Sequence, residues 1–200
     1  MVRDDGHERR DLPLPVRHKS DLPFSPRSLA GGTGSGTPPP IQDSLPGNIA
    51  GQFTGTPSGV ILHGTRSGQP YDIKHEYHAT LNYVRSGAGG LGWNITVGQG
   101  KYCDHIAPES WGWNARGASS RYLAAEFAQA HLGDEISNEQ ISAFCWWFVN
   151  VARVAWPSLP KVFPNHSDLP EGVSDGKSDV EPRGQHSVRD RILAGLEGVP

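Results

Sequence analysis

Residues 59–64 read GVILHG, and the rest of the chain can be understood outward from this stretch. Its apolar run from Val60 to Leu62, rich in β-branched residues, predicts a short, fully buried strand in the centre of a sheet. His63 lies where the strand signal ends, and Gly64 then lets the chain turn. A rigid strand that delivers an imidazole beside a small residue is a usual way to present a metal ligand, although isolated histidines more often lie on the surface or in the core.

A second histidine lies near the C-terminus. Residues 163–179 read FPNHSDLPEGVSDGKSD, in which His166 is followed by a loop rich in Pro and Gly and then by Lys177 and Asp179. Two neutral imidazoles and one carboxylate can form a three-ligand Zn²⁺ site with an open fourth position for water. His186 competes with Asp179 as the third ligand.

These two segments resemble the zinc-dependent N-acetylmuramoyl-L-alanine amidases of type 2, a family related to peptidoglycan recognition proteins and phage endolysins. That family has a first His at the end of a strand and a late motif of the form H-S/R-D/N…P-G…K-S/T-D. The resemblance covers roughly residues 58–197. It implies that His63, His166 and Asp179 bind Zn²⁺ and that Lys177 is the catalytic-site lysine. Asp179 is preferred to His186 because its spacing fits the family motif.

A central segment extends the resemblance. The stretches GWNITVG at 92–98 and KYCDHI at 101–106 predict a β-hairpin. Trp93 lies where some relatives have an active-site tyrosine, but an indole has no phenolic proton to donate. We therefore expect Trp93 either to line the substrate groove or to fill the core.

A further segment, residues 108–130, resembles a family pattern of the form W-H-A-G…I-G-I-E. Trp113 and Asn114 match its start, with Asn114 in place of the usual histidine, and both are candidates for substrate binding. Glu126 aligns with a glutamate that some relatives use near the zinc-bound water. The alternation within 123–129 equally permits Glu126 to be a polar residue on the exposed face of a strand.

Three helices are indicated by apolar residues at helical spacing. One covers residues 72–85. A second begins at Ser137, which forms a capping box with Gln140, and it ends before Pro157. A third follows Ser187. Together with the strand signals, and with what the resemblance implies, this pattern predicts an α/β fold in which helices flank a mixed central β-sheet.

Composition limits the domain organisation and the partners. The first 50 residues are rich in Pro, Gly and Ser and predict a disordered arm or linker, which leaves 51–200 as the catalytic domain. The net charge of −3, without a basic stripe, argues against nucleic acid, and no stretch has transmembrane length. We expect a monomer. The two cysteines, Cys103 and Cys145, lie in apolar stretches and are expected to be reduced.

By resemblance, the chain hydrolyses the amide bond between N-acetylmuramic acid and L-alanine in peptidoglycan. Zn²⁺ would activate water, Glu126 would move its proton to the leaving amine, and Lys177 would stabilise the oxyanion. The alternatives are a non-catalytic peptidoglycan-binding module of the same fold and a cytoplasmic muropeptide-recycling amidase. Residues 1–16 lack the apolar core of a signal peptide. We therefore expect a phage-type endolysin that reaches the wall after holin-mediated release.

Overall fold

The computed structural model describes residues 39–174, 180 and 187–199. The chain divides into two units, residues 1–36 and 37–200, and all the described residues belong to the second unit. Within this described part, no helix is both long enough and apolar enough to cross a bilayer.

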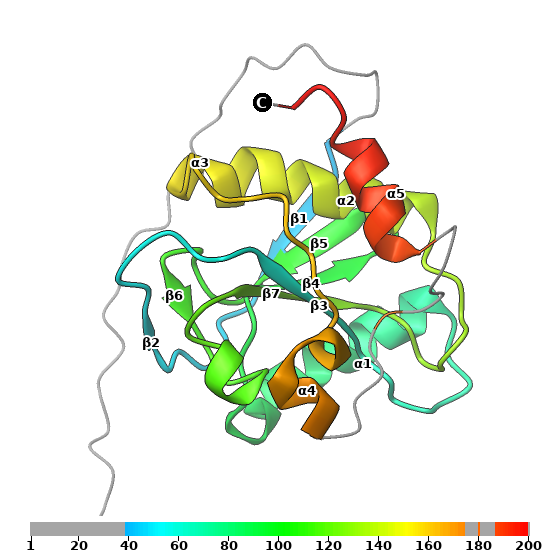
Figure 1. Ribbon diagram of the computed structural model, residues 1–200. Helices are drawn as coiled ribbons and strands as arrows, with labels where there is room; N and C mark the ends of the chain where they lie inside the picture. Colours follow the sequence, from blue (N-terminus) through cyan, green and yellow to red (C-terminus); the bar gives the residue numbers. More distant parts are fainter. Residues whose placement is uncertain (1–38, 175–179, 181–186, 200) are drawn as a thin grey trace, which may run out of the picture. The chain divides into compact units, whose positions relative to one another are not determined.

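A mixed sheet of five strands, in the order β1-β5-β4-β7-β3, forms the centre of the unit (Figure 1). Strands β3, β7 and β4 run parallel to one another, and β1 runs parallel to β5. Strands β4 and β5 form the antiparallel hairpin that the sequence predicts. The strands are β1 (Ile41–Ser44), β3 (Val60–Gly64), β4 (Ile95–Gly98), β5 (Lys101–Asp104) and β7 (Leu123–Phe127). The predicted fold class, a mixed central sheet flanked by helices, is confirmed.

Two helices cover opposite faces of this sheet (Figure 1). Helix α1 (Ile73–Arg85) packs on one face, where Tyr77 and Leu81 meet Cys103. Helix α2 (Asn138–Trp147) packs on the other face within the main core, which also takes in the π-helical turn Phe148–Ala152 and the short α3 (Arg153–Ala155) that continue it. The described chain also contains α4 (Pro170–Ser174), α5 (Val188–Gly195), a two-stranded sheet of β2 (Gly51–Gln52) and β6 (Ser110–Trp111), and 3₁₀ turns at Ala88–Gly90, Arg116–Ala118 and His166–Asp168.

The helix starts follow local capping chemistry. The Asp72 side chain accepts a hydrogen bond from the backbone N–H of His75 at the start of α1. Ser137 and Gln140 exchange both bonds of a capping box at the start of α2. These bonds satisfy backbone donors that a helix otherwise leaves unpaired, which is why the starts were readable from the sequence.

Strand β3 does not occupy the centre of the sheet, where its continuous apolar run had placed it. It is the last of the five strands, but residues 162–165 run along its outer side. The backbone N–H groups of Val60 and Leu62 donate to the carbonyls of Val162 and Pro164, each at 2.9 Å. This extra pairing buries every residue of β3, which explains why its sequence has the pattern of a central strand.

The described part of the chain includes a strand before residue 51. Strand β1 lies within the segment whose composition favoured a disordered arm, and it pairs with β5 from Ile41 through Ser44. Most of β1 is exposed at the sheet edge, so its sequence has no buried apolar pattern to reveal it. Residues 1–38 lie outside the described part of the chain.

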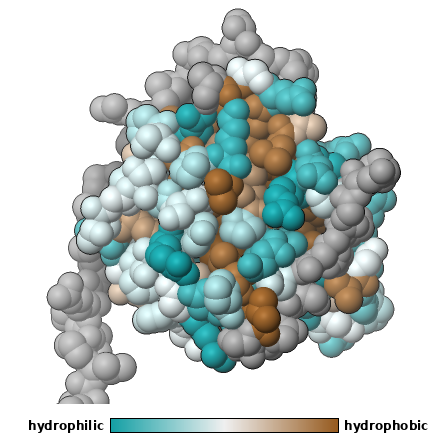
Figure 2. Space-filling model, in the orientation of Figure 1, coloured by the Kyte–Doolittle hydropathy of each residue, from teal (hydrophilic) through white to brown (hydrophobic). Residues whose placement is uncertain are grey.

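The exposed apolar side chains are spread over many elements. Large ones with substantial exposure include Ile41 in β1, Trp113 after β6 and Leu193 in α5. On the face shown in Figure 2, hydrophobic residues are interrupted by hydrophilic ones. The apolar content of the chain therefore mainly builds the two layers on either side of the sheet.

Candidate functional site

The two histidines singled out by the sequence lie side by side. Leu62 of β3 forms a parallel bridge with Asn165, so the residues that follow this pair, His63 and His166, are neighbours in register. Their imidazole centroids are 5.1 Å apart, and the ring planes meet at 69°. His63 is only 4% exposed and His166 only 3%. The fold thus brings together two buried imidazoles from distant parts of the chain.

The position of His166 is fixed by the loop that carries it. Asn165 caps the 3₁₀ turn His166–Asp168 in a capping box with Asp168. Behind this turn, Gly172 of α4 lies so close that a Cβ atom there would be 1.8 Å from the carbonyl oxygen of His166. Helix α4 is itself held by the ion pair between Arg121 and Glu171, with an N–O distance of 2.6 Å. The tight packing leaves His166 little freedom to move.

Glu126 lies next to His63 on the adjacent strand. The two residues are register partners in the parallel pair of β3 and β7. Along β7, Leu123, Ala125 and Phe127 join the main core with α2, so the alternation of side chains turns Glu126 to the opposite face. His63 lies on that same face, because its neighbours Val60 and Leu62 also belong to the α2 side. Glu126 is partly buried rather than on an exposed strand face.

A buried chain of polar groups lies on β4, the strand on the other side of β7. Thr96 is the other register partner of Glu126. The indole N–H of Trp93 donates to the Thr96 hydroxyl at 2.9 Å, and that hydroxyl lies 2.8 Å from Nε2 of His105. Nδ1 of His105 lies 2.7 Å from the carbonyl oxygen of Leu45, so Nδ1 must donate and Nε2 must accept. Burial lowers the pKa of His105 to about 4, which keeps this ring neutral.

Trp93 and Trp113 have different environments. Trp93 is 4% exposed, and its indole N–H donates a hydrogen bond inside the protein. This favours a place in the core over a place lining the substrate groove. Trp113 is 51% exposed, and its ring meets that of Trp111 at 89° with centroids 5.1 Å apart. An exposed, rigidly supported aromatic pair is the kind of surface on which a sugar or peptide can lie.

Asn114 supports the loop that carries Trp113. Its side-chain amide donates to the carbonyl oxygens of Gly92 and Gly112 at 3.1 and 2.8 Å. The next residue, Ala115, packs against Ile61 of β3, on the same face of the sheet as His63. Asn114 therefore links the aromatic pair to the strand that carries His63.

Lys177 and Asp179 lie outside the described residues, as does His186. Among residues 39–174, 180 and 187–199, no group of three or more His, Cys, Asp or Glu side chains could hold a metal ion. The donors that are described fit zinc in part. Two buried imidazoles in contact can offer two nitrogen ligands, and a third donor would have to come from elsewhere in the chain.

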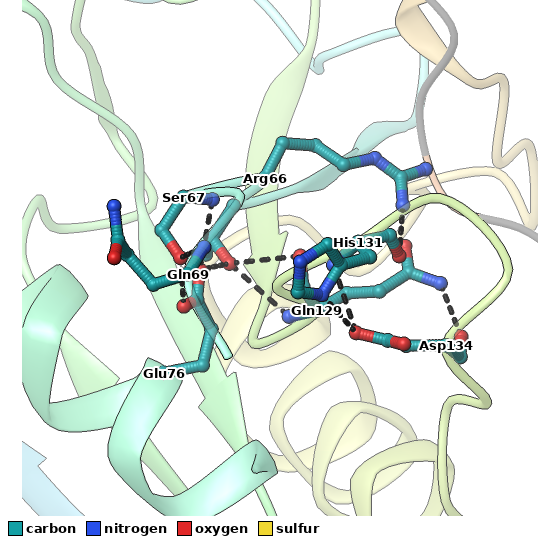
Figure 3. A network of polar contacts seen from close by, with 8 residues as sticks. Arg66, Ser67, Gln69, Glu76, Gln129, His131 and Asp134 are labelled. Carbon is teal, nitrogen blue, oxygen red and sulfur yellow. Dashed lines mark hydrogen bonds and ion pairs between the residues drawn. The ribbon is translucent and has the colours of Figure 1, made fainter. Parts of the chain in front are cut away.

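A polar network beyond the ends of β3 and β7 was not anticipated from the sequence (Figure 3). Its centre is Glu76 of α1, whose carboxylate accepts hydrogen bonds from the hydroxyls of Thr65 and Ser67. The available signal was the spacing of Glu76, which lies one residue before Tyr77 and four before Thr80, both buried on the inner face of α1. A charged side chain on the inner face of a helix requires partners.

The comparisons with known proteins agree with this geometry at the level of the fold. No protein-family model matches the chain, and no curated protein matches its sequence. Solved structures do match. The hydrolase AmiA of Staphylococcus aureus, solved with its ligand, has a TM-score of 0.53 at 14% identity, over 80% of this chain and 84% of that one.

Two further structures have the same fold. The N-acetylmuramoyl-L-alanine amidase LysC of Clostridium intestinale has a TM-score of 0.50 at 15% identity, covering 78% of this chain and 97% of that one. Drosophila PGRP-LB has a TM-score of 0.50 at 14% identity, covering 80% and 94%. The chain therefore has the fold of N-acetylmuramoyl-L-alanine amidases, as the sequence resemblance implied.

Proposed function

We propose that this chain is a zinc-dependent N-acetylmuramoyl-L-alanine amidase, which hydrolyses the bond between the lactyl group of N-acetylmuramic acid and L-alanine of the stem peptide. The observation that carries the proposal is the buried contact between His63 and His166, with Glu126 beside His63 on the next strand. Two imidazoles, on β3 and on the turn beside it, together with a carboxylate on β7, suit hydrolysis better than ligand binding alone.

His63, His166 and Asp179 would hold the zinc ion. The first two are buried and fixed by register and by the packing of Gly172, so little rearrangement is needed for both to offer a nitrogen. Asp179 is proposed as the third ligand from the sequence motif. When bound, Zn²⁺ would polarise the scissile carbonyl and make water a nucleophile near neutral pH.

Glu126 and Lys177 would handle the proton and the charge. We propose that Glu126 accepts a proton from the attacking water and passes it to the nitrogen of L-alanine as the amide bond breaks. The products are then a lactyl carboxylate and a free amine. Lys177 would donate a hydrogen bond to the oxygen on which negative charge develops. The position of Glu126 supports its part in this scheme, because its register pairing with His63 places the carboxylate on the strand beside a proposed zinc ligand.

Trp113 and Asn114 would contribute to substrate binding. Trp113 offers an exposed ring on the loop that Asn114 anchors, and that loop packs on β3 through Ala115. The proposed substrate is peptidoglycan, whose sugars and peptide can lie across an aromatic surface. AmiA, a structural neighbour, was solved in complex with its ligand, which supports ligand binding by a protein of this fold.

Mass spectrometry of fragments released from purified peptidoglycan tests the proposal. We expect free stem peptides that begin with L-alanine and glycan strands with intact lactyl groups. A chelator should stop the release, and added Zn²⁺ should restore it. Binding to peptidoglycan without any released fragment would instead establish a binding module. Soluble muropeptides, assayed in parallel, separate wall hydrolysis from muropeptide recycling.

A further inference from the structure

Glu76 is a buried carboxylate that the proposed chemistry does not use. It lies in α1 and is 1% exposed, on the side of the helix that packs towards the sheet. Removing a carboxylate from water is costly unless its oxygens accept hydrogen bonds. The groups that donate hydrogen bonds to Glu76 therefore indicate which parts of the fold this residue holds together.

Three hydrogen bonds to the Glu76 carboxylate come from one short loop, residues 65–67. The hydroxyl of Thr65 donates to Oε1, and the hydroxyl of Ser67 donates to Oε2. The backbone N–H of Ser67 also donates to Oε1, at 3.2 Å. This loop begins directly after His63 and Gly64 at the end of β3, and Figure 3 shows it wrapped around the Glu76 side chain.

Thr65 extends the contact from β3 to β7. With its own proton directed at Glu76, the Thr65 hydroxyl accepts a hydrogen bond from the backbone N–H of Gln129 at 3.1 Å. The backbone N–H of Thr65 donates to the carbonyl of Phe127 at 3.0 Å, and that of Arg66 donates to the carbonyl of Gln129 at 2.9 Å. Thr65 thus joins α1 to both strands that carry candidate site residues.

The join is also close-packed. A Cβ atom on Gly64 would lie 2.7 Å from Oε1 of Gln129, so the Gln129 side chain packs directly against the backbone of Gly64. One residue before Gly64 is His63, and three residues before Gln129 is Glu126. A shift of the Thr65 loop would therefore reach both side chains through one or a few backbone units.

We infer that Glu76 is a positioning residue for the candidate site: through Thr65 and Ser67 it fixes the ends of β3 and β7, and hence the spacing of His63, His166 and Glu126. As a statement about catalysis, this inference rests on the proposed amidase function. As a statement about geometry, it can be tested without activity. Misplacing a catalytic group by about 1 Å can cost about 100-fold in rate, so a small shift is enough to matter.

Two substitutions remove the contact in different ways. Glu76→Gln keeps the shape of the side chain but removes the charge that attracts three donors. Thr65→Val is nearly isosteric and removes the hydroxyl that connects Glu76 to Gln129. Thr65→Ser restores the hydroxyl and should rescue the effect. The matched control is Thr80→Val, because Thr80 is a buried residue of the same helix whose hydroxyl donates only within the helix, to the carbonyl of Glu76.

Three measurements on each full-length variant distinguish positioning from stability. We expect Glu76→Gln and Thr65→Val to lower kcat by about 10–100-fold with KM within about twofold. Both variants should also bind Zn²⁺ more weakly than the wild type, as measured by competition with a chromophoric chelator. In the metal-free protein, NMR should show loss of the nuclear Overhauser contact between the His63 and His166 rings. Thr80→Val should shift the melting temperature only.

The outcomes separate the two proposals. If the wild type releases stem peptides and binds Zn²⁺, but Glu76→Gln equals it in kcat, zinc affinity and ring contact, the inference about Glu76 is wrong. If the wild type neither cleaves nor binds Zn²⁺, the proposed function fails, and the ring contact alone decides whether Glu76 positions the histidines. Equal effects of Thr80→Val and Thr65→Val on the ring contact would also contradict it, since both would then reflect general loosening of α1.

Discussion

The imidazole of His63 meets that of His166 edge to face, with the ring centroids 5.1 Å apart, because Leu62 and Asn165 are paired one residue earlier. A parallel backbone pairing at the sheet edge thus determines the distance between two side chains from opposite ends of the domain. Whatever these rings bind, their separation depends on this backbone register as well as on the loop contacts that hold the end of β3.

Replacing His63 by alanine should abolish zinc binding and peptidoglycan hydrolysis while leaving the sheet intact. The substitution removes one of two buried nitrogen donors, whereas the strand itself is held by pairing on both sides. Zinc content by mass spectrometry, stem-peptide release and circular dichroism check the three parts. His78→Ala, an exposed histidine of α1, is the control and should behave as the wild type. A His63→Ala protein that still cleaves peptidoglycan at the normal rate would rule out the zinc assignment.

Glu126→Gln should lower kcat by about 100–10,000-fold and leave zinc affinity nearly unchanged, because it removes a proton acceptor without removing a metal ligand. The amide is close in size to the carboxylate, so the partly buried position should still be filled. Steady-state kinetics with a soluble muropeptide check the prediction. Glu135→Gln, at an exposed position before α2, controls for loss of one negative charge. Unchanged turnover would leave Glu126 as a structural residue of β7.

Gly172→Ala should disturb the candidate site by displacing the turn that carries His166. The added Cβ would lie 1.8 Å from the carbonyl oxygen and 2.8 Å from Cδ2 of His166, and the first of these contacts is with backbone that cannot rotate away. Helix α4 must then move, at a cost of about 1–3 kcal/mol in unfolding free energy. Thermal unfolding and zinc affinity should both fall. Gly55→Ala is the matched control, since a Cβ there meets nothing within 4 Å. If Gly172→Ala and Gly55→Ala have the same melting temperature and the same zinc affinity, Gly172 does not hold His166 in place.

The parts of the fold that the sequence predicts depend on short-range physics. The capping box of Ser137 and Gln140, the β4–β5 hairpin and the apolar run of β3 are each encoded within a few neighbouring residues, and each is observed. The resemblance to amidases added the arrangement of these elements. It rested on spaced motifs, and the shared fold of the solved amidase structures confirms it.

The parts that were missed depend on partners far away in the sequence. β1 is an exposed edge strand, and only its pairing with β5 defines it. The position of β3 at the end of the sheet is hidden because residues 162–165 cover it. The partners of Glu76 lie in a loop whose approach to α1 no local pattern reveals. For the same reason, the burial of Trp93 could not be separated from an exposed position until its contact with Thr96 was known.

Trp113→Ala should weaken peptidoglycan binding with little effect on stability. Half of this side chain is in water, so its removal loses contact area for a ligand rather than core packing. We expect KM to rise by several-fold and the unfolding free energy to change by no more than about 0.5 kcal/mol. Trp93→Ala is the informative contrast. It leaves a cavity at a buried position and should lower the unfolding free energy by about 3–5 kcal/mol. Co-sedimentation with purified peptidoglycan and denaturant unfolding distinguish the two. Unaltered binding by Trp113→Ala would exclude Trp113 from the groove.

Asp104 and His105, adjacent at the end of β5, should make opposing contributions to the pH dependence of stability in the acidic range. Burial lowers the pKa of His105 from 6.5 to about 4, so the unfolded chain binds more protons there and stability increases as pH rises from 4 to 6.5. Burial raises the pKa of Asp104 from 3.8 to about 6, although Gln42 and Trp147 oppose this by hydrogen bonding. The folded protein then binds more protons at Asp104, and this stability is lost as pH rises through 6.

The contributions of His105 and Asp104 to the slope of unfolding free energy against pH have opposite signs. Asp104→Asn removes one of them and should therefore leave the contribution of His105 visible. Between pH 4 and 6.5, the unfolding free energy of the variant should increase relative to the wild type by about 3 kcal/mol, since each pKa unit corresponds to about 1.4 kcal/mol. Urea unfolding at half-unit pH steps measures the difference directly. His105→Asn should have the opposite effect. Only the contribution of Asp104 then remains, so the unfolding free energy should fall as pH rises. Parallel curves for wild type and Asp104→Asn would mean that the Asp104 carboxyl titrates alike in the folded and unfolded chains, despite its place between β1 and α2.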